Sequence, residues 1–135
     1  MKSHFFTLFL VLLLDQISKY YVITYHYPYL LNPGIAFSIP LANSIVSIIV
    51  IIVIFWLYNF WLNLRTRSLV SSIAMGMIVG GALGNLVDRI HLGAVIDFIK
   101  VPYWPTFNVA DSAVSIGVIL LIWVMRTRNK TKNGE

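Results

Sequence analysis

Long apolar stretches alternate with shorter polar ones along this chain. Four of the apolar stretches reach the ~20 residues that a helix needs to cross the hydrocarbon core of a bilayer. They lie at about residues 5–23, 44–64, 68–87 and 109–125. Turn-rich polar segments at about 24–43 and 88–108 connect the first to the second and the third to the fourth. The pattern therefore predicts an all-α integral membrane protein, with one membrane domain over residues 1–135.

Composition supports a membrane protein. Hydrophobic residues make up 59% of the 135 and charged residues only 11%, against ~45–50% and ~25% in soluble domains. A soluble fold this small could not bury so much apolar surface. The absence of cysteine excludes disulfides, thiolate catalysis and sulfur-ligated metal sites. The net charge is +5, and the basic residues responsible for it lie at the ends of the segments. This distribution indicates membrane topology and not nucleic-acid binding.

Lysine and arginine are distributed unevenly about the predicted spans. On one side lie Lys2, Arg65, Arg67, Arg126, Arg128, Lys130 and Lys132. Only Lys19, Arg89 and Lys100 fall on or near the other side. Under the positive-inside rule, both termini are expected in the cytoplasm, with residues 126–135 as a basic cytoplasmic tail.

Acidic residues are rare, and four of the five lie at or beside the spans. These are Asp15, Asp88, Asp97 and Asp111. A charged aspartate near the middle of a bilayer costs ~2.5–3.5 kcal/mol on insertion scales. Such residues are therefore candidates for function.

Asp15 interrupts the first apolar stretch and is followed four residues later by Lys19. No A-x-A-like site follows the stretch, so we expect a permanent span and not a cleaved signal peptide. At a spacing of four, the two side chains share a helix face and can form an ion pair. A structural pair that orients the first helix is the favoured interpretation, and direct catalysis by Asp15 is the alternative.

The third span carries a stripe of small residues at a spacing of four, Gly76, Gly80 and Gly84. Such a stripe lets a neighbouring helix backbone approach closely. It continues to Asp88 at the end of the span, with Asn85 and Arg89 beside it as a second pair. These polar residues fit either a packing interface capped by an Asp88 and Arg89 network or support for a functional site.

Two interpretations are open for the start of the fourth span. Asn108 and Asp111 have the spacing of a helix N-cap and its capping-box partner, which explains Asp111 without any function. Asp97, however, lies in an apolar run with no basic residue four positions away. If Asp97 and Asp111 converged, they would share one proton, because like charges so close cannot both ionise. The helix N-terminus would favour the ionised form at Asp111.

Other catalytic arrangements are missing from the sequence. The three histidines lack the HExxH spacing of a zinc protease, and there is no G-x-S-x-G elbow and no P-loop. Ser18 and Lys19 are adjacent and so point in different directions on a helix. We therefore expect no metal and no other cofactor, with aspartates as the remaining candidates.

The order of five short motifs resembles the lipoprotein signal peptidases (signal peptidase II). The motifs are DQISK at 15–19, NPGIAF at 32–37, GGALGNLVDR at 80–89, GAVIDF at 93–98 and WPTFNVADS at 104–112. Each motif is weakly specific alone. Five in the same order, with a four-span layout over nearly the whole chain, are strongly specific.

The resemblance implies an aspartic endopeptidase of the bacterial cytoplasmic membrane. It would remove the signal peptide of a prolipoprotein just before a cysteine that carries diacylglycerol, at the extracytoplasmic face. The family fold adds a small β platform on that face, expected from residues 26–41. The implied partners are diacylglyceryl-modified prolipoproteins, membrane lipid and inhibitors of the globomycin type. A monomer is expected, with no nucleic acid.

Site residues follow from the resemblance motif by motif. Asp97 and Asp111 correspond to the catalytic pair. The expected substrate-binding or site-supporting residues are Asp15, Lys19, Asn32, Gly34, Asn85, Asp88, Arg89, Asn108 and Ala110.

Two other classes of protein compete with this interpretation. A small four-helix exporter would place an unpaired carboxylate near the midplane as its coupling site. Here the one deep acid, Asp15, has Lys19 within reach. A non-catalytic packing subunit would explain the glycine stripe, but not the surroundings of Asp97 and Asp111.

Overall fold

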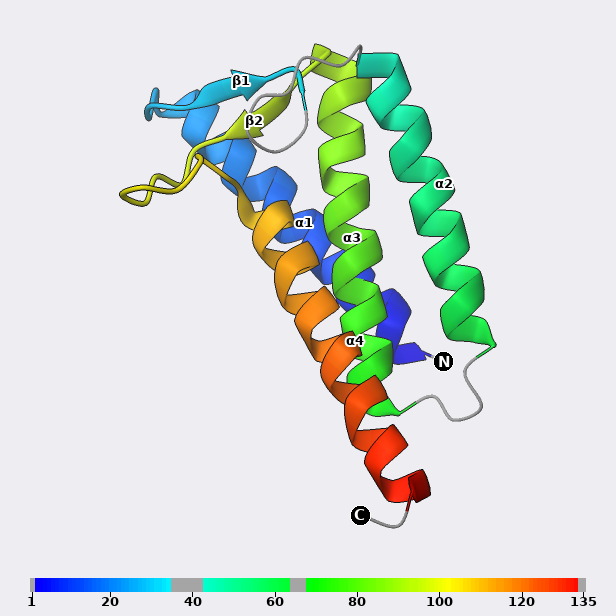
Figure 1. Cartoon of the computed structure of the whole chain (residues 1–135). Helices are drawn as coiled ribbons and strands as arrows, with labels where there is room; N and C mark the ends of the chain where they lie inside the picture. The colour runs from blue at the N-terminus through cyan, green and yellow to red at the C-terminus, as the bar shows by residue number, and fades with distance from the viewer. Residues whose placement is uncertain (1, 35–42, 64–67, 134–135) are drawn as a thin grey trace.

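In the part of the chain that the structure describes, four long helices carry a small two-stranded sheet at one end (Figure 1). The computed structural model describes residues 2–34, 43–63 and 68–133. Its helices are α1 (Lys2–Thr24), α2 (Asn43–Leu62), α3 (Leu69–Leu92) and α4 (Val109–Asn133). Each contains a stretch long and apolar enough to cross a membrane. The predicted fold class is confirmed.

Two helices extend beyond their predicted spans. α3 continues to Leu92 instead of ending at residue 87. It ends where Gly93 adopts a left-handed conformation (φ 71°) and donates its N–H to the Arg89 carbonyl, 3.1 Å away. Glycine takes this conformation without the strain that a Cβ would add. α4 continues to Asn133, so most of the predicted basic tail has a helical backbone.

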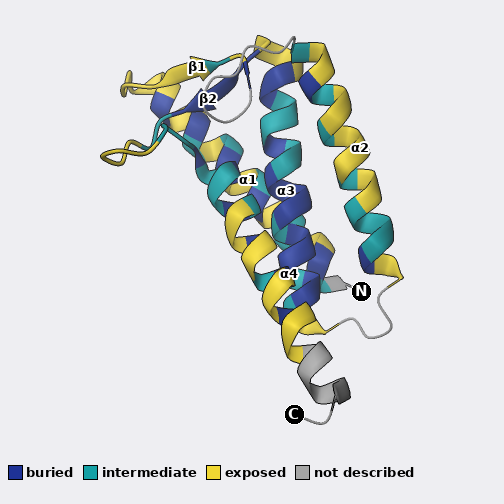
Figure 2. Ribbon diagram, in the orientation of Figure 1, coloured by how far each residue is buried: buried dark blue, intermediate teal, exposed yellow. Residues whose placement is uncertain are grey.

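α3 is the central helix. It packs along α1 and α4 and, over a shorter contact, against α2. In its most apolar stretch 56% of residues are buried, against 11% in α2, whose surface is largely exposed (Figure 2). Trp61 of α2 joins a cluster of buried residues completed by Ala74, Met75, Ile78, Val79 and Leu121.

Glycines allow α1 and α3 to approach closely. A Cβ on Gly76 would lie 2.5 Å from the His4 carbonyl oxygen, and one on Gly80 would lie 2.6 Å from that of Leu8. Real Cβ atoms do not come this near to backbone oxygens, so both positions require glycine. The close-packing role predicted for the glycine stripe is confirmed.

The sheet takes one strand from the segment between α1 and α2 and one from the segment between α3 and α4. β1 (Leu30–Asn32) pairs antiparallel with β2 (Val95–Asp97). Leu30 lies opposite Asp97, and Asn32 lies opposite Val95. The predicted small β platform is confirmed: the region expected to form it, residues 26–41, supplies β1, and the partner strand β2 comes from the segment between α3 and α4. Residues 35–42 lie outside the described residues.

Candidate active site

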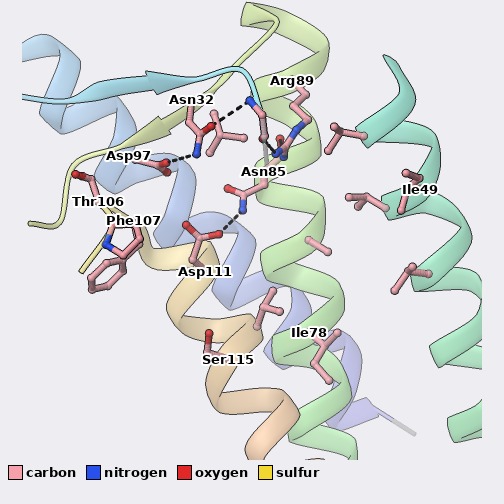
Figure 3. A pocket seen from close by; sticks show the side chains of 18 of the residues that line it. Asn32, Ile49, Ile78, Asn85, Arg89, Asp97, Thr106, Phe107, Asp111 and Ser115 are labelled. Carbon is pink, nitrogen blue, oxygen red and sulfur yellow. Dashed lines mark hydrogen bonds between the residues drawn. The ribbon is translucent and has the colours of Figure 1, made fainter. Parts of the chain in front are cut away.

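A pocket of about 940 Å³ opens between α2, α3, α4 and the sheet (Figure 3). Its larger part, the apolar trough, is lined on the three helices by Val46, Ile49, Val50, Val53, Ile54, Leu57, Ile78, Ala82, Val114 and Val118. The polar end of the pocket, nearest the sheet, is lined by Asn32, Gly34, Asn85, Arg89, Asp97 and Asp111. Six of the predicted site residues thus meet in one pocket.

The loop between β2 and α4 folds back on itself and brings Asp97 near the start of α4. Phe107 donates its N–H to the Ile99 carbonyl at 3.1 Å, and its own carbonyl accepts from the N–H of Ile99 at 2.8 Å. The segment from Asp97 to Asn108 therefore begins and ends at nearly the same place, with Asp111 one helical turn beyond.

Asn108 binds both candidate catalytic aspartates. Its Nδ2 donates to Asp97 Oδ1 at 2.8 Å, and its backbone N–H donates to Asp111 Oδ2 at 3.2 Å. In return, the N–H of Asp111 donates to Asn108 Oδ1 at 2.9 Å. The predicted capping box is confirmed. It does not exclude a further role for Asp111, which also lines the polar end of the pocket.

Asp97 is only 3% exposed and receives two side-chain hydrogen bonds. Besides the bond from Asn108, Asn32 Nδ2 on β1 donates to Asp97 Oδ2 at 3.0 Å (Figure 3). Burial raises the pKa of the Asp97 carboxyl above its ordinary value, and the negative charge of Asp111 acts in the same direction. The hydrogen bonds from Asn32 and Asn108 oppose this rise, because they favour the charged form.

The side-chain amide of Asn85 is held in one orientation. Its Oδ1 accepts from Lys19 Nζ at 3.1 Å and from Asn108 Nδ2 at 3.0 Å. With two donors on that oxygen, the NH₂ group must face the other way, and it donates to Asp111 Oδ1 at 2.8 Å. Lys19 thereby acts on Asp111 through Asn85, without lining the pocket itself.

Behind the pocket lies a buried ionic network centred on Lys19. Lys19 Nζ lies 2.7 Å from Asp15 Oδ2 and 2.8 Å from Asp88 Oδ2. The other oxygen of Asp15 accepts from the N–H of Ala110 at 2.9 Å, and Asp88 Oδ2 accepts from that of Ile96 at 3.1 Å. The network therefore joins α1, α3, β2 and the first turn of α4.

The predicted pair between Asp15 and Lys19 is confirmed. Of the two interpretations open for Asp88 and Arg89, support for the site fits their contacts better than a capping network of the two residues. Within the described residues, Asp88 forms its ion pair with Lys19. Arg89 points instead to the pocket, where its Nη2 donates to the Gly34 carbonyl at 2.9 Å. Neighbours on a helix project in different directions, so a lysine on α1 reaches Asp88 more easily than Arg89 does.

Sequence reasoning missed Gln16. Its Nε2 lies 3.1 Å from Asp88 Oδ1 and 3.2 Å from the Gly84 carbonyl, so it ties α1 to α3. Its position next to Asp15, as a polar residue inside an apolar span, could have identified it as a candidate.

The α2 wall of the apolar trough carried no comparable signal in the sequence, because apolar residues lie on all faces of α2. Among the described residues, no group of histidines or acidic residues is arranged to hold a metal ion.

Comparisons with known proteins show the family to which the sequence is similar. A family model described as signal peptidase (SPase) II matches residues 7–127. A lipoprotein signal peptidase of Moorella thermoacetica is 38% identical over 133 residues, covering 84% of this chain and 86% of that protein. One of Halothermothrix orenii is 37% identical over 136 residues, covering 90% and 93%.

Two solved structures of a bacterial membrane enzyme, both obtained by the in meso method, have a similar fold. One superposes with a TM-score of 0.86 at 29% identity and covers 100% of this chain and 93% of the other. The second has a TM-score of 0.82 at 30% identity and covers 93% of each. The resemblance found in the sequence is confirmed, and the exporter alternative is not supported.

Proposed function

The chain belongs to the signal peptidase II family and is an integral membrane protease; from this premise we propose that it removes signal peptides from prolipoproteins by aspartate catalysis. The cut would fall just before a cysteine that carries diacylglycerol. The observation that carries this proposal is the hydrogen bonding of Asn108 to both Asp97 and Asp111 beside an apolar trough.

The mechanism uses the two carboxyl groups in different protonation states. Asp111, as carboxylate, takes a proton from a water molecule while the water oxygen bonds to the scissile carbonyl carbon. Asp97 keeps its proton and hydrogen-bonds the carbonyl oxygen, which stabilises the negative charge that this oxygen carries in the tetrahedral intermediate. The C–N bond then breaks, and the leaving amine of the modified cysteine takes a proton from the pair. The raised pKa of Asp97 supports this assignment.

The apolar trough provides room for the acyl chains of the substrate. It runs from the polar end along α2, α3 and α4 and is lined by aliphatic side chains. Each buried CH₂ contributes ~0.8 kcal/mol, so acyl chains supply affinity that a short peptide cannot. The trough thus supports a lipid-modified substrate rather than an unmodified peptide.

We place the active site at the extracytoplasmic face and both termini in the cytoplasm. The start of α1 and the end of α4 lie at one end of the molecule, and the sheet lies at the other (Figure 1). Tyr103 and Trp104 are exposed near the sheet, and such aromatic side chains favour the membrane–water interface.

A purified-enzyme assay tests the proposed activity. The substrates are a synthetic prolipopeptide with a diacylglyceryl cysteine and the same peptide with an unmodified cysteine. We expect cleavage before the modified cysteine, little cleavage of the unmodified peptide, and inhibition by a cyclic peptide of the globomycin type. Equal cleavage of both peptides, or cleavage at another bond, would contradict the proposal.

A further inference from the structure

We propose that Ser115 recognises the glyceryl ester groups of the substrate lipid, and so determines specificity for an ester-linked lipid. This inference rests on the proposed function and extends it. Ser115 lies on α4 and lines the pocket together with Asp111 (Figure 3). The next lining residues on the same helix, Val114 and Val118, are aliphatic.

Ser115 is the polar exception in an aliphatic region. Asn85 on α3 and Asp111 on α4 mark the polar end of the pocket. Farther from the sheet, the described helical residues that line the pocket are all aliphatic apart from Ser115. A hydroxyl facing an apolar region is unfavourable unless it finds a hydrogen-bond partner. A substrate group with an acceptor oxygen at this depth would supply that partner.

The hydroxyl of Ser115 is uncommitted, unlike others on these helices. Serine and threonine in helices commonly bond to the carbonyl four residues earlier. Residues in this chain that do so are Thr7, Ser47, Ser72, Ser112 and Thr127. Within the described part of the chain, Ser115 makes no such bond to the Asp111 carbonyl and no other hydrogen bond. Its donor is therefore available to a ligand.

The position of Ser115 matches the position of the substrate esters. A helix rises ~1.5 Å per residue, so Ser115 lies ~6 Å beyond Asp111 along α4. In the substrate, the glyceryl esters follow the cysteine sulfur by a few bonds, and the acyl chains continue from them. With the scissile bond at Asp111 and the chains in the apolar trough, the esters pass beside Ser115. Ester oxygens accept hydrogen bonds, and the hydroxyl donates one.

Two variants of equal shape test this role. Ser115→Thr keeps the hydroxyl, whereas Ser115→Val replaces it with a methyl group. Each is compared with wild type on two lipopeptides with the same peptide and chain length, one with ester-linked and one with ether-linked chains, since an ether has no carbonyl. The measured quantity is the ratio of kcat/KM for the ester to that for the ether substrate.

We expect wild type and Ser115→Thr to prefer the ester, and Ser115→Val to lower kcat/KM for the ester by ~3–10-fold, the worth of one hydrogen bond. Cleavage of the ether substrate should change little. An unchanged ratio in Ser115→Val, with both substrates cleaved, would overturn the role of Ser115 but leave the proposed function intact. If wild type cleaved neither lipopeptide, both proposals would fail.

Discussion

At the scale of single residues, Asp97 and Asp111 have unequal surroundings. Asp97, the last residue of β2, is buried and accepts hydrogen bonds from Asn32 and Asn108. Asp111 accepts hydrogen bonds from the Asn85 amide and from the backbone of its own capping box. An aspartic protease needs one proton on such a pair, and unequal surroundings decide which member holds it.

Removing the Asn32 amide should shift the pH dependence of the reaction. Asn32 favours the charged form of Asp97, so Asn32→Leu should raise the pKa of Asp97 further. Asp97 then retains its proton to higher pH, and the alkaline limb of kcat/KM should move up by roughly 0.5–1 unit. Tyr103→Ala, at a fully exposed position, is the control and should leave the limb in place. A downward shift would contradict the assignment of the proton to Asp97.

Local spacing made some residue contacts predictable and left others hidden. The pairs Asp15 with Lys19 and Asn108 with Asp111 follow from helical geometry within a few residues. The bonds from Lys19 to Asp88 and from Asn32 to Asp97 join positions more than 60 apart in the chain. They depend on how the helices and strands pack, which the spacing of residues along the chain does not specify.

At the scale of elements, the buried network fixes α1 against α3 and α4. Lys19 is 2% exposed and balances two carboxylates. Removing one partner of a buried ion pair costs about 3–5 kcal/mol, because the remaining charge is left uncompensated. The network therefore stabilises the arrangement of helices and orients Asn85 at the same time.

Lys19→Met should lower stability strongly. Combining it with Asp15→Asn should recover part of the lost stability. The second change removes one of the two unpaired charges, though not the lost bond to Asn85. The thermal midpoint in detergent measures the change in stability, and kcat measures the effect of losing the bond that orients Asn85. We expect kcat of the double variant to stay well below wild type. Full recovery of kcat would show that Lys19 has no part in orienting Asn85.

The glycine stripe offers a second test at this scale. A Cβ on Gly84 would lie 2.5 Å from Asp15 Oδ2, whereas one on Gly76 would meet the His4 backbone near the opposite end of α3. Gly84→Ala should displace the ionic network and lower kcat on the order of tenfold or more, since small misplacements of catalytic groups are costly. Gly76→Ala is the matched control, expected to lower the thermal midpoint with kcat per folded molecule nearly unchanged. Equal kcat in the two variants would contradict this.

Element ends were harder to predict than the elements themselves. The apolar pattern predicted all four helices, but placed the end of the third at residue 87, where polar residues begin. Asp88 and Arg89 are polar yet buried, because they bind groups on α1, β2 and the segment after β1. The helix therefore continues to the glycine that ends it.

At the scale of the whole molecule, the layout places the polar end of the pocket beside the sheet and the apolar trough along the helices. The four-helix fold was predictable because bilayer spans are long and apolar. The sheet was only partly predictable, since its three-residue strands carry little pattern and pair across the chain. The trough was not predictable, because α2, α3 and α4 offer aliphatic side chains on many faces.

The proposed orientation can be tested because the natural chain has no cysteine. Single cysteines at the exposed positions Lys100, near the sheet, and Thr127, near the end of α4, would report opposite sides of the membrane. In intact cells, an impermeant maleimide should label Lys100→Cys and leave Thr127→Cys unlabelled until the cells are broken. The reverse pattern would contradict the proposed topology.

The most direct measurement of the central claim is cleavage of a diacylglyceryl prolipopeptide by purified Asp97→Asn and Asp111→Asn variants. Each removes one member of the proposed pair at nearly constant shape. We predict that both lose signal-peptide release by at least ~10³-fold, as expected when an essential acid or base is removed, while their thermal midpoints show that the fold is retained. A folded variant of either kind that still released the signal peptide at a rate near wild type would contradict the account.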